Sequence, residues 1–114
     1  MSREVTIASA LRLARGCLAD ARLLAGSGSR NAAYLADQAL EQLIRAFATS
    51  ENIHIERADA HQLDKVIRAF PDAMGQKHAL RRLSWLEAYA TSFRYPSPAG
   101  RIPRSPDPQR LASA

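Results

Sequence analysis

The distribution of prolines constrains this chain more than any other feature of its sequence. Of its 6 prolines, 5 fall between Pro96 and Pro108, so Pro71 is the one proline of the first 95 residues. Those 95 residues also hold only 4 glycines. Because proline and glycine form turns and end regular elements, this distribution excludes a β-rich fold with many tight turns and favours long helices. A length of 114 residues is typical of one domain with its own core.

Apolar residues recur at intervals of three and four in four segments, which indicates four amphipathic helices. The first is expected over about residues 4–25 and the second, which is rich in alanine, over about residues 30–49. A short third helix, with an N-cap at Asp59, is predicted to end at Pro71, and a fourth covers about residues 76–93. The sequence therefore predicts an all-α fold, an antiparallel up-and-down bundle of four helices or of five.

The composition changes where the prolines cluster. Residues 1–95 are expected to form the bundle, and residues 96–114 form a Pro/Ser/Arg-rich tail that we expect to be extended or disordered. The chain begins without the apolar core of a signal peptide, and it has no apolar run long enough for a membrane span. Its single cysteine, Cys17, is predicted to be a small core residue and is consistent with a reducing compartment. We therefore expect a cytoplasmic protein without membrane contact.

The second predicted helix has the clearest division into two faces. Alanines and leucines share one face, and their small side chains would allow a neighbouring helix to approach closely. The opposite face is expected to be polar and comprises Asp37, Gln38, Glu41, Gln42 and Arg45. Tyr34 falls on this polar face and is a candidate for a dimer contact.

The chain carries a net charge of +5 and has a pI near 10.1, which is compatible with phosphate-bearing partners. Codon usage alone would also explain a basic chain whose 16 cationic residues are nearly all arginine. The sequence has no phosphate-binding glycine loop, no paired cysteines and no nucleophile elbow. Its 3 histidines do not pair with one another or with Cys17 at helical spacing, so no metal site and no cofactor are expected.

Aromatic and basic side chains share one side of the fourth predicted helix. Trp85 and Tyr89 point away from the leucine stripe, on the same side as Arg82. Such a face fits a protein interface, in which these residue types are enriched. It also fits packing within the bundle, or stacking on the bases of a nucleic acid.

Two further positions are candidates because of their charge. Arg94 lies on the inner side of the fourth helix, close in phase to Glu87, so that the two would pair or lie at an open end of the bundle. His61 lies near the start of the third helix and follows Arg57. A histidine in that position is either solvated or part of a site.

Three segments resemble the HEPN domain, the higher eukaryotes and prokaryotes nucleotide-binding domain. The stretch 33–46 is similar to the second helix of that family, and His61-Gln62-Leu63 resembles its Thr-His-Asp-Leu signature. Phe93-Arg94-Tyr95-Pro96 resembles the Arg-Tyr-Pro signature that ends its last helix. The segments occur in the order of the family, and the resemblance extends over about residues 5–96.

The resemblance implies a bundle of four or five helices that usually forms a homodimer. It also implies a binding partner. In the toxin–antitoxin pairs of the family this partner is a minimal nucleotidyltransferase, and the other candidates are a nucleotide and RNA. Many members are metal-independent ribonucleases with an arginine, a polar residue next to it, and a histidine separated from the arginine by four to six intervening residues. That pattern is not intact here, because Ala58 follows Arg57 and His61 comes too early, and because no histidine follows Arg94.

We therefore expect a non-catalytic, dimeric module that binds a nucleotide-bearing ligand or a nucleotidyltransferase partner. Its candidate ligand-binding residues are His61, Arg94, Tyr95 and Glu87, and its candidate interface residues are Trp85, Tyr89, Arg82 and Tyr34. One alternative is a ribonuclease toxin, in which His61 would help to deprotonate a 2′-hydroxyl while Arg57 and Arg94 stabilise the phosphorane. The other alternative is a purely structural dimerisation module.

Overall fold

The computed structural model describes residues 2–56, 62–90, 101 and 106–113. These residues form the helices α1 (Arg3–Gly26), α2 (Asn31–Ser50), α3 (Leu63–Arg68) and α4 (Lys77–Leu83), the 3₁₀-helix η2 (Ser84–Tyr89) and the helix α5 (Pro108–Ser113). This part of the chain contains no strand, and the prediction of an all-α fold is confirmed. None of the helices described combines the length and the apolar character that a membrane span requires.

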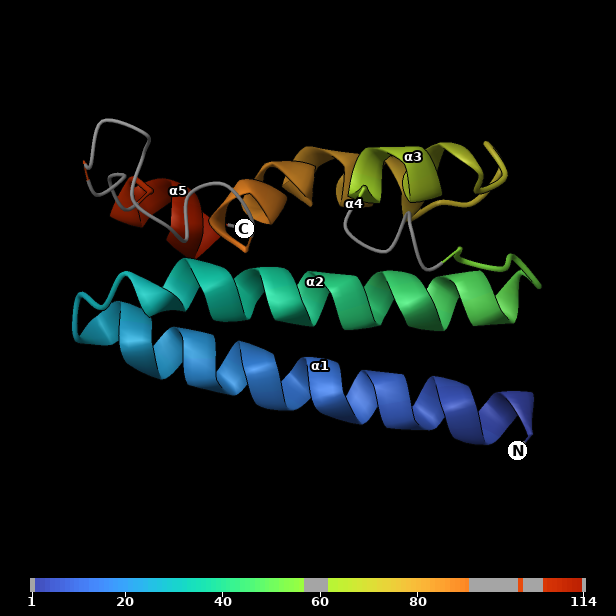
Figure 1. Ribbon diagram of the computed structural model, residues 1–114, viewed down its shortest axis with the longest axis horizontal. Coiled ribbons are helices and arrows are strands. Elements are labelled where there is room, and N and C mark those ends of the chain that lie inside the picture. Colours follow the sequence, from blue (N-terminus) through green and yellow to red (C-terminus); the bar gives the residue numbers. More distant parts are fainter. Residues whose placement is uncertain (1, 57–61, 91–100, 102–105, 114) are drawn as a thin grey trace.

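The first two helices form a long antiparallel hairpin (Figure 1). The hydroxyl of Ser2 begins α1 by accepting a hydrogen bond of 3.2 Å from the backbone N–H of Val5. At the other end, Gly28 turns the chain with a φ of 75°, which glycine adopts without strain. Both helices bury alanines, among them Ala10 of α1 and Ala33 of α2, so their backbones approach closely. The predicted bounds of both helices are confirmed to within one residue at each end.

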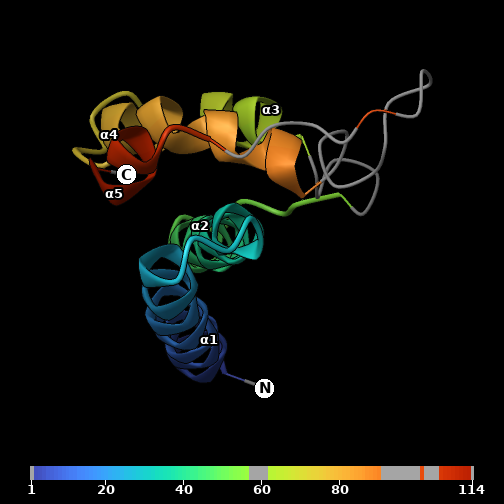
Figure 2. The same cartoon turned by 90° about the vertical axis from the view of Figure 1, so that its left-hand side faces the viewer.

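Helix α2 is the central element of the molecule. It has α1 on one side, and α3, α4 and η2 return along its other side (Figures 1 and 2). The main core lies between α2 and this second layer, and its buried members are Leu40, Ile44, Ala48, Leu63, Val66, Ile67, Phe70, Leu80 and Leu86.

The central position of α2 overturns one prediction. Because the helix is covered on two sides, the face expected to be polar is not a solvent-facing surface. Asp37 is completely buried, with an exposed fraction of 0%, and Glu41 is half-buried. Of the five residues expected on that face, Arg45 alone is exposed.

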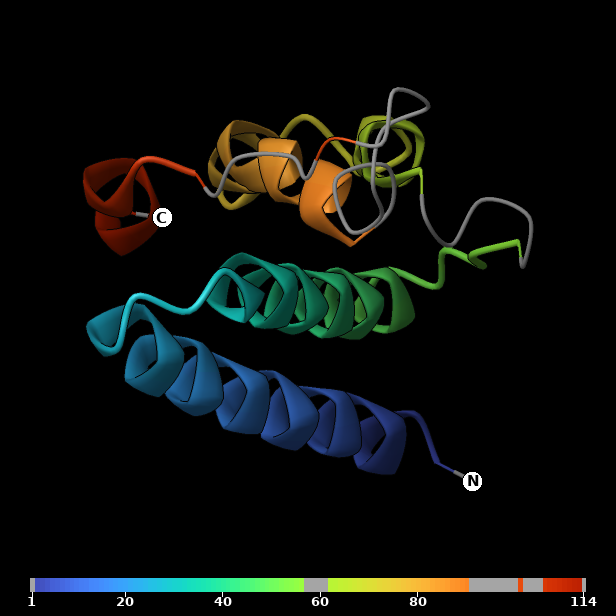
Figure 3. The same ribbon diagram turned by 60° about the vertical axis from the view of Figure 1, so that its left-hand side comes forward.

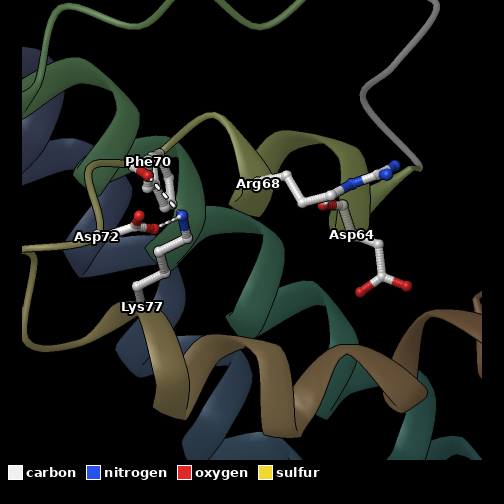
Figure 4. Close-up of polar contacts among 5 residues, drawn as sticks. All are labelled: Asp64, Arg68, Phe70, Asp72 and Lys77. Atoms are coloured by element: carbon white, nitrogen blue, oxygen red, sulfur yellow. Dashed lines mark hydrogen bonds and ion pairs between the residues drawn. The ribbon is translucent and has the colours of Figure 1, made fainter.

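A lysine joins the end of α3 to the start of α4 (Figure 4). The Nζ atom of Lys77 donates hydrogen bonds of 2.7 Å to the carbonyl oxygen of Phe70 and 2.7 Å to the carboxylate of Asp72. Within α3, the Nε atom of Arg68 donates to the carbonyl oxygen of Asp64 at 3.3 Å. The two bonds of Lys77 fix the turn around Pro71, which ends the third helical segment as predicted. The expected N-cap, Asp59, lies outside the described residues.

The prediction of one α-helix over residues 76–93 is wrong in its second half. The α-helical part ends at Leu83, and the chain continues as the 3₁₀-helix η2 to Tyr89. Its leucines are spaced by three, at Leu80, Leu83 and Leu86. Because a 3₁₀-helix has three residues per turn, it keeps such a stripe in line where an α-helix would let it drift. Leu80 and Leu86 are both buried.

The C-terminal segment also differs from its prediction. Residues 108–113, expected to be extended or disordered, form α5 in the same layer as α4 and η2 (Figures 1 and 3). Leu111 is half-buried and packs against the core cluster. The backbone N–H of Gln109 donates to the carboxylate of Asp107 at 2.9 Å, which caps the first turn. The apolar contact of Leu111 and the cap by Asp107 both help to hold this short helix in place.

Candidate functional site

The structure describes some of the candidate residues and not others. Arg57, His61, Arg94 and Tyr95 lie outside the described residues. The candidates that it places are Glu87, Trp85, Tyr89, Arg82 and Tyr34. The three residues of the alternative ribonuclease site are all in the first group.

Glu87 lies on η2 and links it to the beginning of α3. Its Oε2 atom accepts a hydrogen bond of 3.2 Å from the backbone N–H of Leu63, the first residue of α3. A carboxylate at this position satisfies one of the free N–H groups of a helix N-terminus and interacts favourably with the helix dipole. Glu87 therefore has a structural role beside any role in ligand binding.

The carboxyl group of Asp37, on α2, lies near those of Glu41 and Glu87. Asp37 is completely buried, and neither of its carboxyl oxygens has a hydrogen-bond partner of good geometry. One turn further on, Glu41 is half-buried, and its Oε2 atom accepts a hydrogen bond of 3.2 Å from the side-chain amide of Gln38. We refer to Asp37, Glu41 and Glu87 as the carboxyl cluster.

The cluster shifts the protonation of its most buried member. Burial raises the pKa of Asp37 to about 9, and the neighbouring Glu41 and Glu87 add to the effect. Asp37 is therefore protonated at neutral pH and is available as a hydrogen-bond donor inside the bundle. Within the described ranges, no group of three His, Cys, Asp or Glu side chains could hold a metal ion.

The aromatic–basic surface predicted on the fourth helix is partly covered by the chain itself. Trp85 and Tyr89 are half-buried, and their rings meet edge to face with centroids 5.9 Å apart. The guanidinium carbon of Arg110, on α5, lies 4.0 Å from the centroid of the Trp85 ring. Contacts within the chain therefore cover part of the Trp85 ring, in agreement with one of the three roles considered for this face.

The other two interface candidates differ in exposure. Arg82 is exposed on α4, whereas Tyr34 is half-buried on α2. Cys17, expected in the core, is also only half-buried. An interface role for Trp85, Tyr89, Arg82 and Tyr34 stays a prediction.

An apolar groove with a volume of about 540 Å³ runs between α1, α2, the end of α4, η2 and α5. Its lining is dominated by aliphatic side chains, which are Leu11, Ala14, Leu18, Ala21, Ala25, Ala36, Ala39, Leu40, Leu43, Leu83, Leu86, Leu111 and Ala112. Leu18 retains an exposed fraction of 40%. Arg15 and Arg22 also line the groove, so cations border its apolar surface.

Sequence reasoning missed Arg110, Leu111 and the groove. A signal for α5 is present, because an aspartate followed by a proline, Asp107-Pro108, is typical of a helix N-terminus. The groove has no comparable signal in the sequence. It arises because α1 packs against α2 and leaves its leucines at the margin of that contact.

Comparison with known families identifies one match. The model of the HEPN domain matches residues 7–109, which is nearly the whole chain. No curated protein and no solved structure matches the chain. The matched region ends within α5, beyond residue 95, the expected end of the bundle.

Proposed function

Because the chain belongs to the HEPN domain family, we propose that it is a non-catalytic homodimeric module that binds a nucleotide-bearing ligand or a nucleotidyltransferase partner. The observation that carries the proposal is the apolar groove. Burial of apolar surface is the main driving force of association, and contiguous exposed apolar patches mark interaction sites.

A second copy of the chain is the occupant that we assign to the groove. Helix α1 has α2 as its main packing partner, so the hairpin keeps one long side without a covering layer. A copy docked along that side would bury Leu11 and Leu18 and would give α1 a second neighbour. The resemblance to a family that usually forms homodimers supports the same occupant.

The non-catalytic character rests on the sequence. The spacing of arginine and histidine that the ribonucleases of the family use is not intact around Arg57 and His61. The ligand is proposed to carry phosphate because the chain is rich in arginine, whose planar guanidinium suits phosphate recognition.

Two measurements on the purified wild-type protein test the proposal. Sedimentation across the micromolar range should give the mass of a dimer, and thermal unfolding with nucleotides should give a higher melting temperature than without them. A monomer at every concentration, together with an unchanged melting temperature, would overturn the proposal. Cleavage of RNA by the purified protein, lost in His61→Ala, would replace it with the ribonuclease.

A further inference from the structure

A second hollow lies between α4, η2 and α5. It adjoins the apolar groove at Leu83 but has a more polar lining. It has a volume of about 360 Å³, and its lining residues are Ala79, Arg82, Leu83, Trp85, Arg110 and Ser113. Two of these six side chains are arginines, and they come from elements far apart in the sequence. The volume lies within the range of small-molecule sites.

One of the two guanidinium groups is held in place before any ligand arrives. Arg110 stacks on Trp85, with 4.0 Å from its guanidinium carbon to the ring centroid. Trp85 is itself fixed, because it meets the ring of Tyr89 edge to face and packs against the core. Stacking through the flat face leaves the N–H groups at the edge of the guanidinium free to donate. A donor that is already ordered loses less entropy on binding.

The charges of the hollow are not neutralised within the described part of the chain. Among the described residues, no carboxylate lines the hollow and none forms an ion pair with Arg82 or Arg110. Asp107 is the acidic residue closest in sequence to Arg110, and its carboxylate accepts a hydrogen bond from the backbone N–H of Gln109 at the start of α5. The hollow therefore presents positive charge and several N–H donors, which together favour an anion.

We propose that this hollow binds the phosphate group of a small phosphate ester, with Arg82 and Arg110 as the anion-binding residues and Trp85 as the wall on which Arg110 is fixed. The inference deepens the proposed function, on which it rests, by assigning the place where the nucleotide-bearing ligand is held. A phosphate group has enough acceptor oxygens for two guanidinium groups at once. The remaining volume, bordered by Leu83 and Ala79, leaves room for the organic part of the ester.

The sole tryptophan of the chain allows a direct test. Trp85 fluorescence of the full chain is titrated with AMP and with inorganic phosphate at low salt, and calorimetry gives the affinities independently. We expect a saturable change with AMP, and affinity at least about tenfold weaker in Arg82→Gln and in Arg110→Gln, because each loses a charged hydrogen-bond donor. Arg81→Gln is the matched control, since it removes the same charge from the exposed side of α4 without touching the hollow.

The outcomes separate this site from the proposed function. Equal binding of AMP and of inorganic phosphate, lost in both variants, would support a site that recognises the phosphate alone. Equal weakening in Arg81→Gln would overturn the site, because net charge would then explain the binding. AMP binding that none of the three variants affects would also overturn it while the proposed function stands. A wild-type dimer that binds neither AMP nor phosphate would overturn the inference and leave the dimer in place.

Discussion

Asp37 is the side chain whose environment differs most from that of the same group in water. It is completely buried, its carboxyl oxygens have no hydrogen-bond partner of good geometry, and Glu41 and Glu87 lie near it. An ionised carboxylate in such surroundings would be costly, so the group stays protonated. The sequence places this residue on a polar face, and its burial results from the second layer of helices above α2.

This burial predicts how stability depends on pH. The pKa of Asp37 is about 9 in the folded chain against the ordinary aspartate value of 3.8, so between these pH values the folded state holds one proton more than the unfolded state. The free energy of unfolding should therefore fall as pH rises, by at most about 1.4 kcal/mol per pH unit from this group.

Asp37→Asn removes the titrating group and should gain stability over wild type as pH rises through that window. Urea unfolding of both proteins at about pH 5 and about pH 8 measures the difference. Asp20→Asn, on the exposed surface of α1, is the control for the loss of one negative charge. A stability difference between Asp37→Asn and wild type that is the same at both pH values would contradict this description of Asp37.

At the scale of the elements, the helices that the sequence predicts best are those with a sustained period and clear ends. The bounds of α1 and α2 follow from alternating intervals of three and four between apolar residues, and from a glycine-rich turn between them. The change from α4 to η2 was not predicted, because a stripe of leucines spaced by three fits a single face of either helix type over two turns. The contact of Arg110 with Trp85 joins residues 25 positions apart, and no local pattern encodes it.

In the candidate site, too, some features follow from local sequence patterns and others depend on packing between elements. Glu87 was identified as a charge near the inner side of its helix, but its bond to Leu63 depends on how η2 meets α3. The burial of Asp37 depends on which elements cover α2, and an amphipathic pattern read from one helix contains no such information. Sequence patterns therefore predict which elements form, while the environment of a side chain depends on the packing of several elements at once.

Two glycines of the helical hairpin should respond to alanine in opposite directions. Gly16 lies within α1, where a Cβ atom would meet no neighbour within 4 Å. Gly16→Ala should therefore stabilise the chain by about 0.5–1 kcal/mol. Gly28 has a φ of 75°, so Gly28→Ala forces an alanine into the left-handed region and should destabilise by about 1 kcal/mol.

Urea unfolding of the two variants beside wild type checks this prediction. The two substitutions add the same methyl group, and they differ in the backbone conformation that receives it. Stabilisation by Gly28→Ala, or destabilisation by Gly16→Ala, would contradict the hairpin geometry described above.

At the scale of the whole molecule, α2 lies between two layers, and the large buried side chains among the described residues lie on one side of it. Large aliphatic and aromatic side chains fill the space between α2 and the second layer, whereas the α1 side is packed through alanines and borders the apolar groove. A monomer would leave this groove in water. A dimer would cover it, and for that reason we propose that the chain forms a homodimer.

The sedimentation of two matched variants tests that claim most directly. Leu18→Glu places a charge in the groove, whereas Leu23→Glu places it on α1 outside the groove, at a leucine with an exposed fraction of 75%. We predict a dimer for wild type and for Leu23→Glu. We predict a mass near the 12.5 kDa of one chain for Leu18→Glu, because the charged side chain would have to lose its water when a second copy covers the groove, which weakens association by about a hundredfold or more. A Leu18→Glu protein that still sediments as the dimer, or a wild type that sediments as the monomer throughout, would contradict the account.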